Sequence, residues 1–219
     1  MKGKNLAPLC GVLAVVMVIV AFFALGQSTP GGDDSAAKVV KFYKDNGGRE
    51  IAAAVVLAFA GVPLIYFAGM LRDRGRAATQ GRSALPALAF GGGVVSAGGF
   101  MTAGALHFAL SDYADDIQPT AAQAINAIDN DFFLPFAVGL VTLVLATSLM
   151  AIRVGLLPKW LGWAGVVIFV IGFTPIGFVA FGLAGIWVIV VSILFYVRGE
   201  TVGGAAAPPP AQPAVGSPT

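Results

Sequence analysis

Long apolar runs separated by short polar segments make up most of this chain. A helix needs about 20 mainly apolar residues to cross the hydrocarbon core of a bilayer. Because lipid offers no partners for backbone polar groups, unbroken runs of that length predict membrane-spanning helices. The pattern therefore predicts an all-α, polytopic transmembrane helix bundle in residues 1–198, with six spans at 6–26, 51–71, 85–108, 132–152, 161–174 and 176–197.

The last two spans belong to one continuous apolar run, 161–197. Proline lacks an amide hydrogen and disfavours helix at the residue before it. Thr174-Pro175 therefore predicts a tight hairpin between a short fifth span and the sixth.

Two polar segments between the spans carry helix signals of their own. Residues 35–46 place apolar residues among lysines and precede Gly47-Gly48, which predicts a short interfacial helix that stops there. A second short outer helix is expected after Pro119, with Thr120 as its cap. The two segments align at an offset of 85, so either a unit of span, outer helix and span is duplicated, or two alanine-rich helices look alike by accident.

Charged residues divide into two sets that alternate along the chain. The amino terminus, residues 72–84, residues 153–160 and the tail hold nine Lys and Arg against two acids. Residues 27–50 and 109–131 hold four Lys and Arg against nine acids. Lys and Arg of short loops stay preferentially on the cytoplasmic side of a membrane. Both termini are therefore predicted to be cytoplasmic, and the acidic set is predicted to lie outside.

Composition excludes several classes of protein. Hydrophobic residues make up 58% of the chain and charged residues 11%, whereas a soluble domain carries about 25% charged residues. The formal net charge of +2 follows from membrane orientation, so no nucleic-acid partner is expected. A single cysteine, Cys10, excludes an intrachain disulfide. Residues 199–219, rich in Ala and Pro, predict a disordered cytoplasmic tail.

The first apolar run has two interpretations. Lys2 and Lys4 precede it and Ala24-Leu25-Gly26 ends it, as in a cleavable signal peptide. The apolar region of a signal peptide is about 7 to 15 residues long, whereas this run covers residues 6–25. The length favours a retained span, and cleavage stays open as the alternative.

Small residues recur at helical spacing in the third span. They allow two helix backbones to approach closely where lipid supplies no hydrophobic drive. A helix-packing face is therefore expected, and the alternative is that the glycines bend the helix around a cavity. The face consists of Gly92, Ser96, Gly99 and Ala103.

Chemically active side chains are few. His107 is the only histidine, and with Asp112, Asp115 and Asp116 it forms the one candidate set for a metal at the outer face. Zinc sites need three or four ligands at suitable spacing, so the sequence assigns no metal and no cofactor. No catalytic motif is present and the spans carry no ionisable group near their middle, so no catalytic residue is assigned either.

Two groups of residues indicate contacts with lipid. Trp160 and Trp163, beside Lys159, are expected to anchor the start of the fifth span at the depth of the headgroups. A basic cytoplasmic loop is expected to engage anionic headgroups. Its arginines are Arg72, Arg74, Arg76 and Arg82.

Several short motifs carry a resemblance. The most specific is Leu-Pro-Lys-Trp-Leu-Gly-Trp at 157–163; the others are Phe-Tyr-Lys-Asp-Asn at 42–46, Leu71-Arg72, Asn-Asp-Phe-Phe-Leu-Pro at 130–135, and Trp187 with Ser192. With these motifs the chain resembles a family of uncharacterised multi-pass membrane proteins from actinobacteria over about residues 5–198. The resemblance implies a domain of unknown function in the bacterial plasma membrane, and it supplies no substrate and no site residues.

These observations favour a non-enzymatic integral membrane protein that acts through contacts, as an accessory, envelope or sensor protein. Its expected partners are the lipid bilayer and either a membrane protein or a second copy of the chain. One alternative is a small permease or channel for an unidentified solute. The other is a membrane enzyme with a metal at its outer face.

Overall fold

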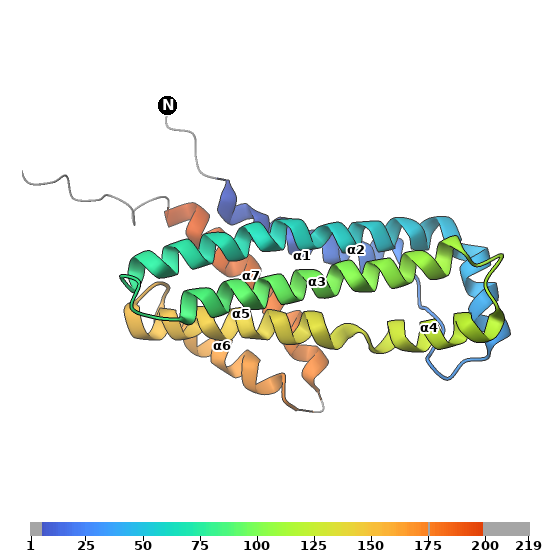
Figure 1. The fold of residues 1–219 in the computed structure, drawn as a ribbon. Helices are drawn as coiled ribbons and strands as arrows, with labels where there is room; N and C mark the ends of the chain where they lie inside the picture. The colour runs from blue at the N-terminus through green and yellow to red at the C-terminus, as the bar shows by residue number, and fades with distance from the viewer. Residues whose placement is uncertain (1–5, 175, 199–219) are drawn as a thin grey trace, which may run out of the picture.

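All regular structure is helical in residues 6–174 and 176–198, which are the residues that the computed structural model describes. Two long helices, α2 (Ala36–Ala78) and α3 (Leu85–Asp112), run antiparallel, and α5 (Phe133–Val154) packs along α3 (Figure 1). The other elements are η1 (Ala7–Leu9), α1 (Cys10–Ile19), the π-helical η2 (Val20–Leu25), α4 (Pro119–Asp131), α6 (Lys159–Ile171) and α7 (Gly177–Arg198).

Several of these helices, alone or continuous with a neighbour, have the length and composition of membrane spans. The prediction of an all-α fold with long apolar helices is confirmed, and α6, with 13 residues, is apolar but shorter than the others. Within the described residues, five helical segments are long and apolar enough to cross a membrane: Ala7–Leu25, Ala36–Ala78, Leu85–Asp112, Pro119–Val154 and Gly177–Arg198.

The prediction that a short helix ends at Gly47-Gly48 is wrong. Ser35 caps α2 by accepting the amide hydrogen of Lys38 at 3.4 Å, and the helix then runs without interruption to Ala78. Two glycines inside a helix cost about 2 kcal/mol relative to alanine. Packing on both sides of them holds the helix, because Tyr43 and Glu50 are buried against α4 and α3. At 43 residues, α2 is about 65 Å long, twice the thickness of a hydrocarbon core.

A small helical layer forms one end of the bundle. There α4 packs against the first turns of α2 and the last turns of α3, an arrangement called the α4 end below (Figure 1). α4 starts at Pro119 and not after Thr120, because the fixed φ of proline suits the first helical position. The layer has its own core of five buried residues, Val39, Tyr43, Leu110, Ala114 and Ala122.

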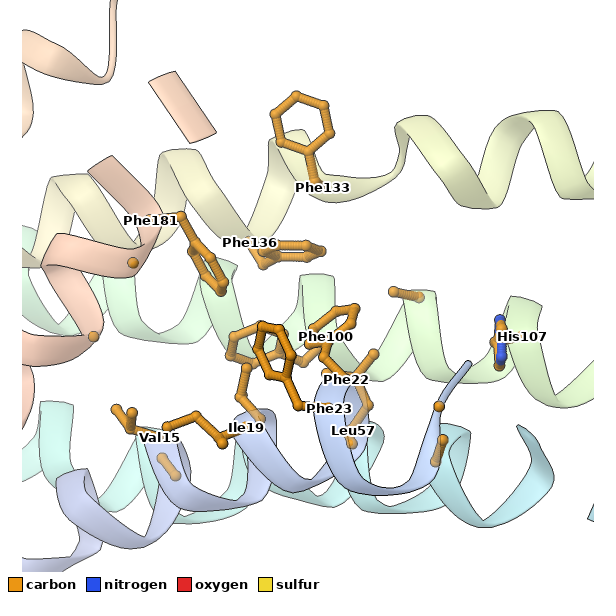
Figure 2. Close-up of a pocket in the computed structure, with 18 of the residues that line it drawn as sticks. Val15, Ile19, Phe22, Phe23, Leu57, Phe100, His107, Phe133, Phe136 and Phe181 are labelled. Carbon is orange, nitrogen blue, oxygen red and sulfur yellow. The ribbon is translucent and has the colours of Figure 1, made fainter. Parts of the chain in front are cut away.

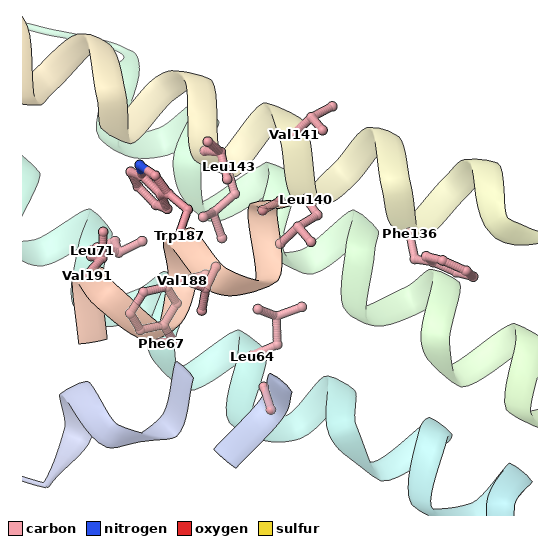
Figure 3. Packing of buried hydrophobic residues seen from close by; sticks show 14 of the residues in the cluster. Leu64, Phe67, Leu71, Phe136, Leu140, Val141, Leu143, Trp187, Val188 and Val191 are labelled. Carbon is pink, nitrogen blue, oxygen red and sulfur yellow. The ribbon is translucent and has the colours of Figure 1, made fainter. Parts of the chain in front are cut away.

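The main core lies where α2, α5 and α7 meet. Figure 3 shows Phe67 of α2, Leu143 of α5 and Val188 of α7 packed together there, all fully buried. A buried hydrogen bond also joins α7 to α6: the indole N–H of Trp187 donates to the Leu161 carbonyl at 3.0 Å. These contacts attach the shorter α6 and α7 to the long helices.

Small residues bring α3 and α5 into close contact. A Cβ added at Gly92 would lie 2.6 Å from the Leu143 amide nitrogen, and one added at Gly99 would lie 2.6 Å from that of Phe136. Between these points the Ser96 hydroxyl donates to the Phe136 carbonyl at 2.9 Å. The structure therefore places three of the four small residues of the third span in one helix–helix contact.

Alanine substitutions at Gly98 and Gly99 are expected to have opposite effects. Nothing lies within 4 Å of a Cβ at Gly98, so alanine there gains up to about 1 kcal/mol of helix propensity. At Gly99 the added methyl pushes α3 away from α5 and costs about 1–3 kcal/mol. Thermal unfolding in detergent should show a melting temperature several degrees lower for G99A and no decrease for G98A. Equal melting temperatures would contradict the close α3–α5 contact.

α6 ends at Ile171, three residues before the predicted end of the fifth span. The amide of Thr174 bonds to the Ile171 carbonyl at 2.9 Å, so residues 172–174 form turns and not a further helical segment. Pro175, which is predicted to divide the two spans, lies outside the described residues. Residues 199–219, for which disorder is predicted, lie outside them as well.

Candidate functional site

Three ionisable side chains from three helices meet near the α4 end. His107 of α3 lies between Glu50 of α2 and Asp129 of α4, with Nε2 2.8 Å from Glu50 Oε2 and Nδ1 2.9 Å from Asp129 Oδ2. Glu50 is fully buried, and the side chains of His107 and Asp129 are each 13% exposed. Glu50 Oε1 also accepts the backbone N–H of Gln27 at 3.0 Å. This group of three, the His107 cluster, joins α2, α3, α4 and the segment that precedes α2.

The uninterrupted course of α2 places Glu50 in the cluster. Glu50 follows Tyr43 by seven residues and precedes Leu57 by seven, so the three side chains lie on one face of the helix. All three are buried. His107 stands near the end of α3 and Asp129 in the last turn of α4, where those helices pack against this face.

The hydrogen-bond pattern indicates the charge of the cluster. An ionised carboxylate only accepts hydrogen bonds, and a neutral imidazole donates only one. Because each ring nitrogen of His107 faces a carboxylate oxygen, both bonds form when the ring is an imidazolium. The cluster then holds one positive and two negative charges. Such pairing is required in a buried site, since an isolated buried ion costs several kcal/mol.

α4 also holds the segment that connects η2 to α2. Asn126, which is fully buried, donates from Nδ2 to the carbonyls of Pro30 at 3.1 Å and Gly31 at 3.2 Å, and its Oδ1 accepts the Tyr43 hydroxyl at 3.2 Å. Tyr43 precedes the predicted span at 51–71. Burial, together with the two carboxylates of the His107 cluster, raises the pKa of Tyr43, so the phenol stays a neutral donor.

The substitution N126L is expected to free the segment between η2 and α2 from its contact with α4. The Tyr43 hydroxyl loses its acceptor, and the carbonyls of Pro30 and Gly31 each lose one of two donors, at a cost of about 1–3 kcal/mol. Limited proteolysis should therefore cut residues 26–35 faster in N126L than in the wild type. Gln118→Ala is the control, because that side chain makes no capping bond. A cleavage rate for N126L equal to that of the control would mean that Asn126 does not restrain the segment.

An apolar pocket of about 740 Å³ adjoins the His107 cluster (Figure 2). Figure 2 shows His107 at one end of the pocket and Val15 at the other, with Phe100, Phe136 and Phe181 between them. The rings of Phe100 and Phe136 stack with centroids 5.1 Å apart, and Phe181 lies 5.2 Å from Phe136. The volume is that of a typical small-molecule site, about 300–1,000 Å³.

The rim of the pocket is apolar and exposed. Phe23 of η2 and Phe178 of α7 both line the pocket, and they are 85% and 70% exposed. Small side chains leave room in the walls: Ala103 of α3 lines the pocket, and so does Gly182 of α7, where nothing lies within 4 Å of an added Cβ. π-Helical turns such as η2 occur frequently at functional sites. Aromatic rings exposed at such a rim favour an opening toward lipid.

The acids near His107 in the sequence do not join it in space. Both ring nitrogens of His107 are engaged within the His107 cluster, whereas Asp115 pairs with Lys44 at 3.1 Å. Asp112 and Asp116 are exposed. In the part of the chain that the structure describes, no group of three or more His, Cys, Asp or Glu side chains is arranged to hold a metal ion.

Glu50 and Asp129 were not predicted from the sequence as partners of His107. A usable signal existed for Glu50, because its seven-residue spacing from Tyr43 and Leu57 puts it on an apolar helix face. The expected stop at Gly47-Gly48 concealed that spacing. No such signal existed for Asp129, since its contact depends on how α4 packs against α3.

The predicted aromatic anchors lie on the surface. Trp160 and Trp163 are 63% and 60% exposed in the first turns of α6, directly after Lys159. Amphipathic rings exposed beside a lysine are typical of the boundary between membrane and water.

The four predicted loop arginines lie at the opposite end from α4, around the connection of α2 to α3. The guanidinium groups of Arg72 and Arg74 lie 5.5 and 4.3 Å from phenylalanine ring centroids. Arg76 and Arg82 are exposed, and Arg82 lines a hollow of about 440 Å³ together with Arg153. The basic residues are thus separated from the acidic His107 cluster by the length of the bundle (Figure 1).

Comparison with known proteins assigns the chain to no family. No protein-family model matches the chain, and no curated protein or solved structure is significantly similar to it. The resemblance to actinobacterial membrane proteins therefore stays a prediction.

Proposed function

We propose that this chain is an integral plasma-membrane protein that acts by non-covalent binding, as a sensor or accessory protein. It holds one amphiphilic molecule in the apolar pocket and offers the α4 end to a partner. The His107 cluster links the two regions, because its three side chains line the pocket and one of them, Asp129, belongs to α4. Occupation of the pocket can therefore change how firmly α4 is held.

The observation that carries this proposal is the combination of an apolar cavity with one polar end. The walls come from α1, α2, α3, α5 and α7, and the ionisable lining groups gather at the His107 end. A ligand with an apolar chain and a polar head matches that distribution. A permease for a polar solute would need polar groups along the whole path, so the apolar walls favour binding over transport.

The proposed topology has six spans with both termini in the cytoplasm. It is supported by nine Lys and Arg against two acids in the set of segments that includes the termini, and by four against nine in the other set. α6 and α7 pack against each other and form the last hairpin. In this orientation the α4 end projects from the outer face of the membrane.

Native mass spectrometry of the protein purified in mild detergent tests the binding function. We expect one amphiphile to remain bound at one-to-one stoichiometry after exchange into a second detergent. A protein that is free of any bound amphiphile under both conditions, with its helical content intact, would contradict the proposal.

Thiol labelling of intact spheroplasts tests the topology. Arg76→Cys and Thr120→Cys are made separately in a Cys10→Ser background, because both positions are exposed and lie at opposite ends of the bundle. A membrane-impermeant maleimide should label position 120 and leave position 76 unlabelled until the membrane is opened. Equal labelling of the two positions in intact spheroplasts would overturn the orientation.

A further inference from the structure

The polar end of the pocket carries a net negative charge. Among the described residues that line the pocket, the ionisable ones are Glu50, His107 and Asp129. Two carboxylates and one imidazolium leave one uncompensated negative charge. The neighbouring cation Arg49 does not line the pocket, and its guanidinium donates to the Ala24 carbonyl at 3.2 Å. Charge effects are strong here, because the pocket is apolar and partly shielded from water.

The hydrogen-bond donors within the His107 cluster are already used, and the further donors that line the pocket, the side chains of Gln27 and Thr29, lie in the less buried segment before α2. As an imidazolium, His107 donates from both ring nitrogens within the cluster, and the Gln27 backbone amide donates to Glu50. Asn130 donates from Nδ2 to the carbonyls of Pro30 at 3.0 Å and Asn126 at 2.8 Å. Within the cluster, the capacity that remains is for accepting hydrogen bonds, since a carboxylate has about four acceptor sites and those of Glu50 and Asp129 are only partly filled.

A head group placed against Glu50 and Asp129 must therefore donate hydrogen bonds and must not be an anion. A hydroxyl or a primary ammonium group meets both conditions. A phosphate, sulfate or carboxylate meets neither, because it brings a second negative charge and more acceptors next to two carboxylates that carry a surplus of both.

We propose that the pocket selects amphiphiles with a neutral or cationic, hydrogen-bond-donating head, placed against Glu50 and Asp129, and discriminates against anionic heads. This inference rests on the proposed binding function and specifies the chemical class of its ligand.

A series of C16 compounds with equal chains separates charge from hydrogen-bond donation. The probe is a photoactivatable hexadecanol, crosslinked to the full-length protein in detergent at pH 7.5. Its competitors are unlabelled hexadecanol, hexadecylamine, hexadecyltrimethylammonium and hexadecyl phosphate. We expect the alcohol and the amine to compete at least tenfold better than the phosphate. The trimethylammonium compound, a cation without donors, should compete more weakly than the amine.

Two variants test whether the His107 cluster causes the head-group selectivity. Asp129→Asn removes one charge and adds an amide donor, so the advantage of the amine over the phosphate should fall at least threefold. Asp131→Asn is the matched control, because Asp131 is exposed and does not line the pocket. Circular dichroism and a melting temperature near that of the wild type establish that D129N is folded. If D129N is unstable, Glu50→Gln provides the same charge change on α2.

Each negative result of these experiments contradicts a different part of the proposal. If hexadecyl phosphate competes as well as hexadecanol, the head-group selectivity is wrong while the binding function stands. If D129N and E50Q both keep the full wild-type selectivity, the assignment to the cluster is wrong. If no C16 compound competes with the probe, the proposed binding function itself fails.

Discussion

Replacing His107 with glutamine is expected to lower the melting temperature in detergent by on the order of 10 °C. The substitution removes the one positive charge between two buried or nearly buried carboxylates, since the Glu50 and Asp129 side chains are 1% and 13% exposed. Breaking a buried ion pair in this way costs about 3–5 kcal/mol, because the remaining charges have no compensation.

A double substitution separates this cause from a loss of packing. In E50Q/H107Q one of the two uncompensated carboxylates is removed. The double variant should therefore have a higher melting temperature than H107Q, although it carries one substitution more. Additive losses would show that His107 stabilises the fold by its shape and not by its charge. Lys44→Gln is the control for a general charge effect, because its pair with Asp115 is exposed and should contribute at most about 1 kcal/mol.

Tryptophan at Gly182 is expected to abolish ligand binding with little change in stability. Gly182 lines the pocket and an added Cβ has nothing within 4 Å, so the indole enters the space that a bound chain would occupy. Crosslinking of the photoactivatable hexadecanol should fall at least tenfold. Gly98→Trp is the matched control, because Gly98 is equally open but lies outside the pocket.

G98W should therefore crosslink as the wild type does. Equal crosslinking in G182W and G98W would mean that the probe binds the outer surface of the bundle and not the pocket. A melting temperature within a few degrees of the wild type for both variants shows that the comparison is one of binding and not of folding.

Local patterns predicted the elements that depend on neighbours in the chain. The third apolar stretch, 85–108, lies within α3, and the small residues Gly92, Ser96 and Gly99 face α5, because spacing along one helix determines which residues share a face. Ser35, an N-capping residue type, starts α2 for the same local reason.

The errors arose where contacts between helices outweigh local preference. Gly47-Gly48 favours a helix end when taken alone, yet α2 passes through it because Tyr43 and Glu50 are bonded to other helices on either side. His107 was placed among its sequence neighbours in the loop. Its actual partners come from α2 and α4, 57 and 22 residues away, and no local pattern predicts such distances.

The pocket could not be predicted from the sequence for a similar reason. Its walls combine residues of α1 and α7, which lie at opposite ends of the chain, with the faces of three further helices. Apolar residues at lipid-facing and pocket-facing positions look the same in a sequence, since both favour large aliphatic and aromatic side chains. Only the packing of the helices determines which of them enclose a cavity.

The most direct test of the account is the orientation of an amphiphile in the pocket. Two C16 alcohols are compared, one with a diazirine beside the hydroxyl and one with it at the far end of the chain. We predict that the first crosslinks to peptides containing His107 or Gln27, whose amide bonds to Glu50, and the second to peptides containing Val15, at the other end of the pocket (Figure 2), or Gly185, where an added Cβ lies 3.6 Å from Val15. If both probes label the same peptides, or mainly exposed residues outside the pocket such as Phe59 and Tyr66, the central claim of an apolar pocket that ends at the His107 cluster is contradicted.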